Sequence, residues 1–248
     1  MDNRIVLEPA FKIREMARRA LADNWQKMFV GMFIYFFMSA GIMSLLNYFF
    51  SSVRRILLPT GVYMSVNVGY ASWLYELAVS GALMYGLALF LLSFFRTKKI
   101  DCGTIFDGFS VFGKTFTLYL LFSVKIFLWS LLFGIPGIIA AFRYSQAFYL
   151  QADHIDWSAT QCIEESKRLM VGNKGKLFYL NLTFIGWYFL ASMADVIFEI
   201  FDFNGLFGIL IGLITAIPVV VVDLYRAMSQ TVFYELVTEN LVVLENNR

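Results

Sequence analysis

The chain has 248 residues, a formal net charge of +2 and 59% hydrophobic residues, and its mean hydropathy is +0.68. A soluble domain of this length could not bury so much apolar surface in one core, because much of any folded surface stays in contact with water. The nearly neutral charge gives no reason to expect a nucleic-acid partner. The composition therefore predicts an all-α, polytopic membrane protein whose main partners are membrane lipids.

Cysteine and histidine usage excludes several kinds of site. The two cysteines, Cys102 and Cys162, fall in segments predicted to be cytosolic, where thiols stay reduced, so we expect no disulfide. His154 is the one histidine of the chain, which excludes a histidine-based metal site and argues against a catalytic triad. We therefore expect no metal, no other cofactor and no enzymatic activity.

The first 27 residues are predicted to be a cytosolic or interfacial amphipathic segment. From Phe11 to Trp25, apolar residues alternate with basic ones that include Arg14, Arg18 and Arg19, a pattern that suits a helix lying on an anionic leaflet. The three arginines are candidate lipid head-group contacts. The segment is charged throughout and does not resemble a cleaved signal peptide.

Residues 28–238 are predicted to form a single transmembrane domain. A crossing needs about 20 apolar residues, and six candidate spans lie near residues 28–50, 70–95, 116–133, 138–152, 177–200 and 205–226. The fourth contains Arg143 and follows a Gly-Ile-Pro-Gly turn, so a re-entrant segment is the alternative there. Residues 51–69 are expected to be an exterior loop, and residues 239–248 a cytosolic tail.

A short cytosolic helix is predicted near residues 158–171. Ser158 and Gln161 have the spacing of a capping box, and Gly172 is a typical helix stop. Lys174 and Lys176 follow this stop and are candidate contacts to lipid head groups.

The distribution of lysine and arginine predicts the topology. Six precede the first span, two lie in the next loop, four lie between Arg96 and Lys114, four between Lys167 and Lys176, and none in 201–204. Basic-rich segments thus alternate with basic-poor ones, which places both termini in the cytosol. No internal repeat supports an inverted-repeat transporter.

The middle of the chain resembles DUF975, a family of bacterial, mainly Gram-positive, integral membrane proteins of unknown function. The resemblance rests on Leu128–Phe133, Ile135–Gly137, Arg143-Tyr144, Asp153, Glu165–Lys167, Met170, Gly172–Lys174 and Phe184–Trp187, and it extends to residues near both ends of the chain. It implies a multi-pass protein of the bacterial cytoplasmic membrane and supplies no catalytic residue. Lys125 departs from an apolar position of the family pattern, so any role of Lys125 is expected to be particular to this chain.

Four ionisable residues at membrane depth are candidate substrate-binding groups. Lys125 and Arg143 are expected near the midplane, and Glu76 and Asp195 nearer the exterior. One interpretation is a wet cavity in which the two cations attract an anion and the acids balance the charge. The alternative is a set of structural ion pairs that bind nothing.

Two further patterns concern helix packing. Gly208 and Gly212 form a small-xxx-small motif that permits close helix approach, either within the monomer or in a homo-oligomer. Asp223 and Arg226 are three residues apart and are expected to form a local surface pair.

The leading functional hypothesis is a non-enzymatic protein that binds or moves a lipid-like or small anionic substrate through a cavity at Lys125 and Arg143. The competing hypothesis is a structural or accessory subunit of a larger membrane or export complex. The first needs an internal cavity, whereas the second needs an exposed surface for a protein partner.

Overall fold

The computed structural model describes residues 5–57, 63–132, 134–199 and 205–239; within these ranges, the side chains of residues 53–57, 63–68, 195 and 197–199 are not described. The elements in chain order are α1 (Ala10–Leu21), α2 (Trp25–Phe36), the π-helix η1 (Phe37–Gly41), α3 (Ile42–Phe50), β1 (Ser52–Leu57), β2 (Tyr63–Val68), α4 (Tyr70–Thr97), the 3-10 helix η2 (Cys102–Phe106), α5 (Asp107–Ser110), α6 (Phe112–Ser130), α7 (Ile135–Tyr144), α8 (Ala147–Asp153), α9 (Ala159–Leu169), α10 (Lys174–Leu182), α11 (Ile185–Glu199), α12 (Gly205–Thr215) and α13 (Ile217–Val237).

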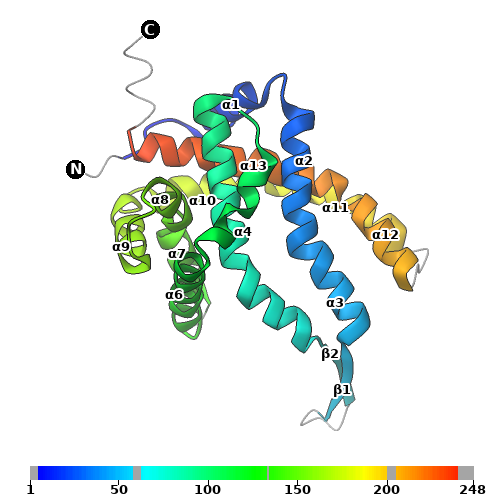
Figure 1. Ribbon diagram of the computed structural model, residues 1–248. Coiled ribbons are helices and arrows are strands. Elements are labelled where there is room, and N and C mark those ends of the chain that lie inside the picture. The colour runs from blue at the N-terminus through cyan, green and yellow to red at the C-terminus, as the bar shows by residue number, and fades with distance from the viewer. Residues whose placement is uncertain (1–4, 58–62, 133, 200–204, 240–248) are drawn as a thin grey trace.

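The described chain is helical apart from one β-hairpin. Strands β1 and β2 pair antiparallel, with Ser52 opposite Val68 and Leu57 opposite Tyr63. The hairpin projects beyond the ends of α3 and α4 (Figure 1). The exterior loop expected here is thus partly a hairpin, because both segments are rich in Val, Ile and Tyr, which favour strands.

Four helical stretches are long and apolar enough to cross a membrane: Trp25–Phe50, Tyr70–Thr97, Phe112–Ser130 and Lys174–Ala194. Within the described residues the number rises to five if α12 and α13, which meet at a 43° bend, count as one span. The structure therefore supports a bundle of several membrane helices. Six crossings stay a prediction.

The fourth predicted span, 138–152, is divided between α7 and α8. α7 has 10 residues and α8 has 7, and the two are separated at Ser145 and Gln146. Neither helix alone reaches the roughly 20 residues that a crossing requires.

Helix α4 is the centre of the bundle, and two glycines allow other segments to approach it closely. A Cβ atom on Gly86 would lie 1.9 Å from the carbonyl oxygen of Ile105, and one on Gly108 would lie 2.0 Å from that of Ala82. Backbone therefore packs directly on backbone where η2 and α5 meet α4, which leaves no space for a side chain at these positions.

The apolar face of α1 packs against α13 within the protein. Ile13, Ala17 and Leu21 are buried, and the hydroxyl of Tyr225 on α13 donates to the backbone carbonyl of Arg14 at 3.0 Å. Figure 1 shows α13 running across α2 and α4 with α1 beside it. The face that the sequence assigned to lipid is thus covered by protein.

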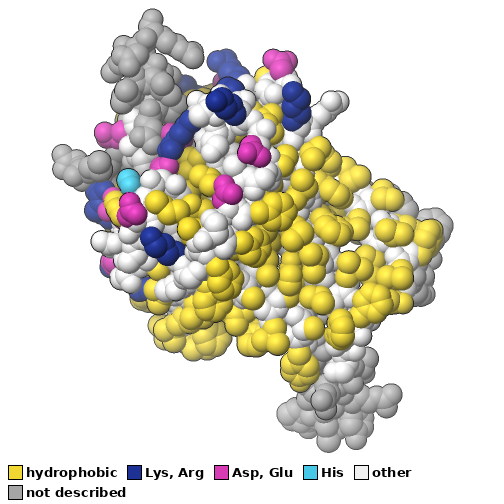
Figure 2. Space-filling view, in the orientation of Figure 1, with side chains coloured by type: hydrophobic (Ala, Val, Ile, Leu, Met, Phe, Trp, Pro, Cys, Tyr) yellow, Lys and Arg dark blue, Asp and Glu magenta, His cyan; other side chains and the backbone are white. Residues whose placement is uncertain are grey.

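Charge and apolar surface occupy different parts of the molecule. Figure 2 shows lysine, arginine, aspartate and glutamate gathered at one side, whereas the rest of this face is almost continuously hydrophobic. Large apolar side chains stay exposed on the outer helices, such as Leu131 at 66%, Phe189 at 69% and Ile214 at 62%. A belt of this kind is compatible with lipid contact and is rare on soluble monomers.

Helix α9 begins and ends as its sequence predicts. The hydroxyl of Ser158 accepts from the backbone N–H of Gln161 at 3.3 Å, and the Gln161 side chain accepts from the backbone N–H of Ser158 at 2.8 Å. Gly172, shortly after the helix, has a φ of +80°, which glycine adopts without strain. The predicted capping box and helix stop are both present.

Candidate functional site

The four predicted intramembrane charges do not form one cluster among the described side chains. The ammonium nitrogen of Lys125, on α6, lies 5.9 Å from the ring centroid of Tyr144. Arg143, on α7, is half-buried. No hydrogen bond or ion pair in the described part of the chain joins Lys125 or Arg143 to Glu76. The side chain of Asp195 lies outside the described residues.

Glu76 lines a partly open cavity of about 300 Å³ between α2, η1, α3, α4 and α6. Tyr35, Tyr75 and Tyr119 contribute to its wall, one each from α2, α4 and α6, together with small polar and apolar side chains. Among the described residues around this cavity, Glu76 is the sole charged one, and the structure gives its carboxylate no hydrogen-bond or ion-pair partner. The cavity thus combines one carboxylate with aromatic rings.

A second cavity of about 380 Å³ adjoins the first. The two share Tyr35, Ser39 and Met84 in their walls. The second cavity continues between α2, α4, α8 and α13, where Asp223 and Arg226 line it. We call these two neighbouring cavities together the α2–α4 hollow; Glu76 lines the first, and Asp223 and Arg226 line the second.

The Asp223–Arg226 pair belongs to this hollow. Arg226 donates to the hydroxyl of Tyr188 at 2.7 Å and lies 3.3 Å from the Asp223 carboxylate, while the Tyr188 hydroxyl donates to the same carboxylate. The side chains of Arg226 and Asp223 are 32% and 26% exposed. The expectation of a surface pair was therefore wrong about its environment, because sequence spacing does not show which way a helix face is turned.

The π-helix η1 shapes the wall between the two cavities. The backbone N–H of Ile42 bonds to the carbonyl of Phe37, five residues earlier, which widens the turn. The Met38 carbonyl accepts a hydrogen bond from the hydroxyl of Tyr75 on α4. The Ser39 hydroxyl bonds back to the carbonyl of Tyr35 at 2.9 Å. The Met38 contact fixes the side chain of Tyr75, and the second hydrogen bond turns the Ser39 side chain back onto the backbone of α2.

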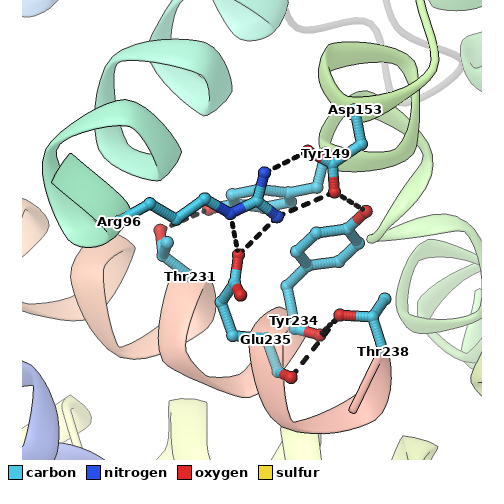
Figure 3. Close-up of polar contacts among 7 residues, drawn as sticks. All are labelled: Arg96, Tyr149, Asp153, Thr231, Tyr234, Glu235 and Thr238. Carbon is cyan, nitrogen blue, oxygen red and sulfur yellow. Dashed lines mark hydrogen bonds and ion pairs between the residues drawn. The ribbon is translucent and has the colours of Figure 1, made fainter. Parts of the chain in front are cut away.

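A second polar cluster fastens three helix ends together, and the sequence analysis missed it. Figure 3 shows Arg96, at the end of α4, reaching between Asp153 of α8 and Glu235 of α13. Its two terminal nitrogens donate to the two Asp153 oxygens at 2.6 and 2.9 Å, and its Nε donates to Glu235 at 2.8 Å. Glu235 is only 2% exposed. We call this cluster the Arg96 clasp.

Aromatic residues complete the Arg96 clasp. The Tyr234 hydroxyl donates to Asp153 at 2.7 Å, and the Tyr234 ring stacks on Tyr149 with centroids 5.2 Å apart. The Tyr149 hydroxyl lies 3.3 Å from that of Thr231 (Figure 3). With both carboxylates engaged by one guanidinium, the cluster is suited to holding helices together, and no free base or nucleophile is presented.

The five basic residues predicted to contact lipid head groups have different surroundings. Arg18 and Arg19 are exposed at the end of α1. The ammonium group of Lys176 donates to the backbone carbonyls of residues 7–8 at 3.1 and 3.2 Å, and Lys174 is half-buried. The guanidinium of Arg14 lies 5.9 Å from the ring centroid of Phe184. Arg18 and Arg19 thus have the most open positions of the five.

The Gly208 and Gly212 motif lines a groove. A cavity of about 360 Å³ separates these glycines on α12 from Gly41 and Ser44. A Cβ atom on Gly212 would meet nothing within 4 Å. The close packing predicted for Gly212 is therefore not made within the described part of the monomer.

Helix α9 carries titratable groups with shifted pKa values that lie outside the candidate spans. A hydrogen bond from the Arg168 guanidinium holds the pKa of Glu165 below its usual value. Burial raises the pKa of the Cys162 thiol to about 11. An adjacent groove of about 670 Å³ runs past Trp157 and Arg168 to Val171, which is 56% exposed.

Comparison with known proteins yields one match. A family described as "Protein of unknown function (DUF975)" matches residues 131–241, which confirms the resemblance found in the sequence. The matched region contains Asp153, Arg226 and Glu235, and it excludes Glu76 and Arg96. Neither the curated proteins nor the solved structures give a match to the chain.

Proposed function

We propose that this chain, which belongs to the DUF975 family through residues 131–241, is a non-enzymatic integral membrane protein that binds a lipid-like molecule inside its helical bundle. Its location would be the cytoplasmic membrane of a bacterium. The observation that carries the proposal is the α2–α4 hollow, whose two cavities combine apolar and aromatic side chains with Glu76 in one and with Asp223 and Arg226 in the other. An amphipathic ligand needs such a lining, because its chain and its polar group require different surroundings.

The same proposal includes a topology with both termini in the cytosol. The clasp brings the ends of α4, α8 and α13 together, and Lys98, just after α4, donates to the backbone carbonyl of Ala20 at the end of α1 at 3.1 Å. This end of the bundle carries many of the basic residues, and the hairpin lies at the opposite end of α4 (Figure 1). The arrangement agrees with the positive-inside rule.

The geometry favours a lipid-like ligand over a small free anion. An anion would need an uncompensated cation, and Arg226 is already paired with Asp223 and hydrogen-bonded to Tyr188. The predicted cations Lys125 and Arg143 do not line either cavity of the hollow. The α4 residues that line the two cavities extend from Tyr75 to Ala88, and the rise from Glu76 to Ala88 alone is about 18 Å, which is comparable to an extended aliphatic chain.

Native mass spectrometry of the protein extracted with its surrounding lipids tests the proposal. Ser39→Leu fills the wall shared by both cavities, and Thr117→Leu adds a similar volume at an exposed position on α6. We expect a retained lipid in the wild type and in Thr117→Leu, and at least a fivefold lower occupancy in Ser39→Leu. Absence of retained lipid in the wild type, or equal occupancy in both variants, would contradict the proposal.

The accessory-subunit hypothesis keeps one supporting observation. The groove beside α9 lies outside the candidate spans and is lined by the half-buried Trp157 and Arg168 and the exposed Val171, which are residue types able to contact a protein. A stoichiometric protein partner in the same spectra, released by Val171→Glu with no change in retained lipid, would favour this second function.

A further inference from the structure

We propose that the Glu76 cavity is a binding site for an organic cation, and that the charged group of the lipid-like ligand is therefore an ammonium or a similar cation. This inference rests on the proposed function and names the class of ligand. It reverses the anionic preference predicted from the sequence. Three observations carry it: the charge of the cavity, its aromatic wall and a second cavity directly beside it.

The first observation is the charge. Glu76 is the one charged residue among the described residues lining the cavity. In the adjoining cavity Asp223 and Arg226 balance each other at 3.3 Å. The hollow as described thus holds one uncompensated carboxylate. A carboxylate at membrane depth is costly to keep charged, and a bound cation offsets that cost.

The second observation is the aromatic wall. Tyr35, Tyr75 and Tyr119 reach the cavity from α2, α4 and α6. The Tyr75 hydroxyl is held by the Met38 carbonyl, so this ring has a fixed position. Aromatic rings attract cations through the negative potential of their faces, and cages of such rings bind quaternary ammonium groups. Rings beside a carboxylate therefore select a cation and reject an anion.

Close packing of α6 against α4 places the third ring. A Cβ atom on Gly81 of α4 would lie 2.8 Å from the Cβ of Tyr119 and 2.6 Å from the carbonyl oxygen of Thr115. The absence of a side chain at Gly81 thus lets Tyr119 approach α4 one turn and a half after Glu76. The site is assembled by backbone approach, and the tyrosines do not reach it from flexible loops.

The third observation is the second cavity, which shares Tyr35, Ser39 and Met84 with the first in its wall. The volume of the first cavity, about 300 Å³, is at the lower end of ligand pockets, which suits a compact head group. Met32, Leu87 and Phe148 are among the apolar side chains that line the second cavity, and the paired Asp223 and Arg226 line it as well. An aliphatic chain attached to the cation can lie there. The ligand class is thus an amphiphilic organic cation.

Titration calorimetry on the full chain in lipid nanodiscs, with empty nanodiscs subtracted, tests the inference. The probes are dodecyltrimethylammonium and dodecanesulfonate, which share a chain and differ in the sign of the head group. The variants are Glu76→Gln, which keeps the shape and removes the charge, Tyr119→Leu, which removes a ring, and Tyr119→Phe, which keeps it. Glu164→Gln is the matched control, because that carboxylate is 53% exposed on α9.

We expect the ammonium probe to bind the wild type, Tyr119→Phe and Glu164→Gln alike, and to bind Glu76→Gln at least tenfold and Tyr119→Leu severalfold more weakly. The sulfonate should bind Glu76→Gln no more weakly than it binds the wild type. Equal ammonium affinity for the wild type and Glu76→Gln, with both proteins folded, would overturn the inference. If the two proteins bind the ammonium probe equally but the native spectra still show a retained lipid, the proposed lipid binding stands. Only the inference that the head group of the ligand is a cation is then overturned.

Discussion

Helix α4 carries two charged residues, Glu76 and Arg96, and their surroundings are opposite. Arg96 follows Glu76 by 20 residues, about 30 Å along the helix. The Arg96 guanidinium meets two carboxylates at 2.6 to 2.9 Å, whereas Glu76 lines a cavity and has no partner among the described side chains. The charge of Arg96 is thus paired within the fold, whereas the carboxylate of Glu76 is available to a ligand.

This difference separates a structural charge from a binding charge. Within the clasp, loss of hydration is offset by bidentate hydrogen bonds, so a further ligand would have to break existing contacts. At Glu76 no such contact exists to be broken. Neither the pKa of a charged residue nor its depth in the membrane separates a structural charge from a binding charge. The hydrogen-bond and ion-pair partners of the residue do.

The largest expected effect comes from removing the centre of the Arg96 clasp. Arg96→Met leaves Glu235, 2% exposed, without its cation, and we expect a loss of about 2–3 kcal/mol in the free energy of unfolding, discounted because Arg96 is itself partly exposed. Denaturant unfolding in detergent measures it. Lys99→Met, at a nearby exposed position, is the control.

Thiol labelling gives a local readout of the same change. Cys162 on α9 is buried and its pKa is raised to about 11, so a maleimide should react slowly with it in the wild type. Loosening α8 in Arg96→Met should speed this reaction. In the denaturant experiment, an unfolding free energy of Arg96→Met equal to that of Lys99→Met would show that the clasp does not hold the helices together.

A smaller effect is expected when the clasp loses one hydrogen bond. Tyr234 is 1% exposed and donates to Asp153 at 2.7 Å. Tyr234→Phe should lower the unfolding free energy by about 1–2 kcal/mol, because the ring is kept and one charge-assisted bond is lost. Tyr179→Phe, at a 58% exposed ring, should have no effect, and equal values for the two variants would count against this reading of Tyr234.

A still smaller effect should depend on pH. Because the Arg168 hydrogen bond lowers the pKa of Glu165 from its usual 4.5, the pair stabilises the fold above that pH and loses its contribution as the pH falls through the lower folded-state pKa. The wild type should exceed Glu165→Gln by about 0.5 kcal/mol at pH 7, and the gap should close in acid. A gap that widens in acid would have the wrong sign.

The smallest effect on stability is expected at the other charge of α4. Glu76→Gln breaks no described contact, so the unfolding free energy without ligand should change by less than about 0.5 kcal/mol, while cation binding falls. Unfolding measured with and without dodecyltrimethylammonium separates the two. A loss above 1 kcal/mol in the ligand-free protein would place Glu76 among the structural charges.

The helices of the fold could be read from the sequence, since long apolar runs and a capping box are local signals. The division of the fourth span at Ser145 and Gln146 was less accessible, because it depends on α8 packing against α4 and α9. The hairpin had a signal in its β-branched residues, but its position next to a charged, proline-containing stretch favoured a loop.

The candidate site was predicted only in part. Glu76 was singled out from its depth, and the structure places it in a cavity. Depth says nothing about the rotation of a helix, so the pairing of Lys125 with Arg143 stays a prediction; the structure places Lys125 beside Tyr144, the residue after Arg143. The clasp was missed because Arg96 reads as a topology signal and its partners lie 57 and 139 residues away in the chain.

The packing of α1 on α13 has a consequence for how the chain is made. About 200 residues separate the end of α1 from the start of α13, and at roughly 5–20 residues per second the ribosome needs about 10–40 s to supply them. During that interval the apolar face of Ile13, Ala17 and Leu21 lacks the helix that makes most of its contacts in the folded protein, so we expect the nascent α1 to need another apolar surface, such as a lipid leaflet, until α13 is made.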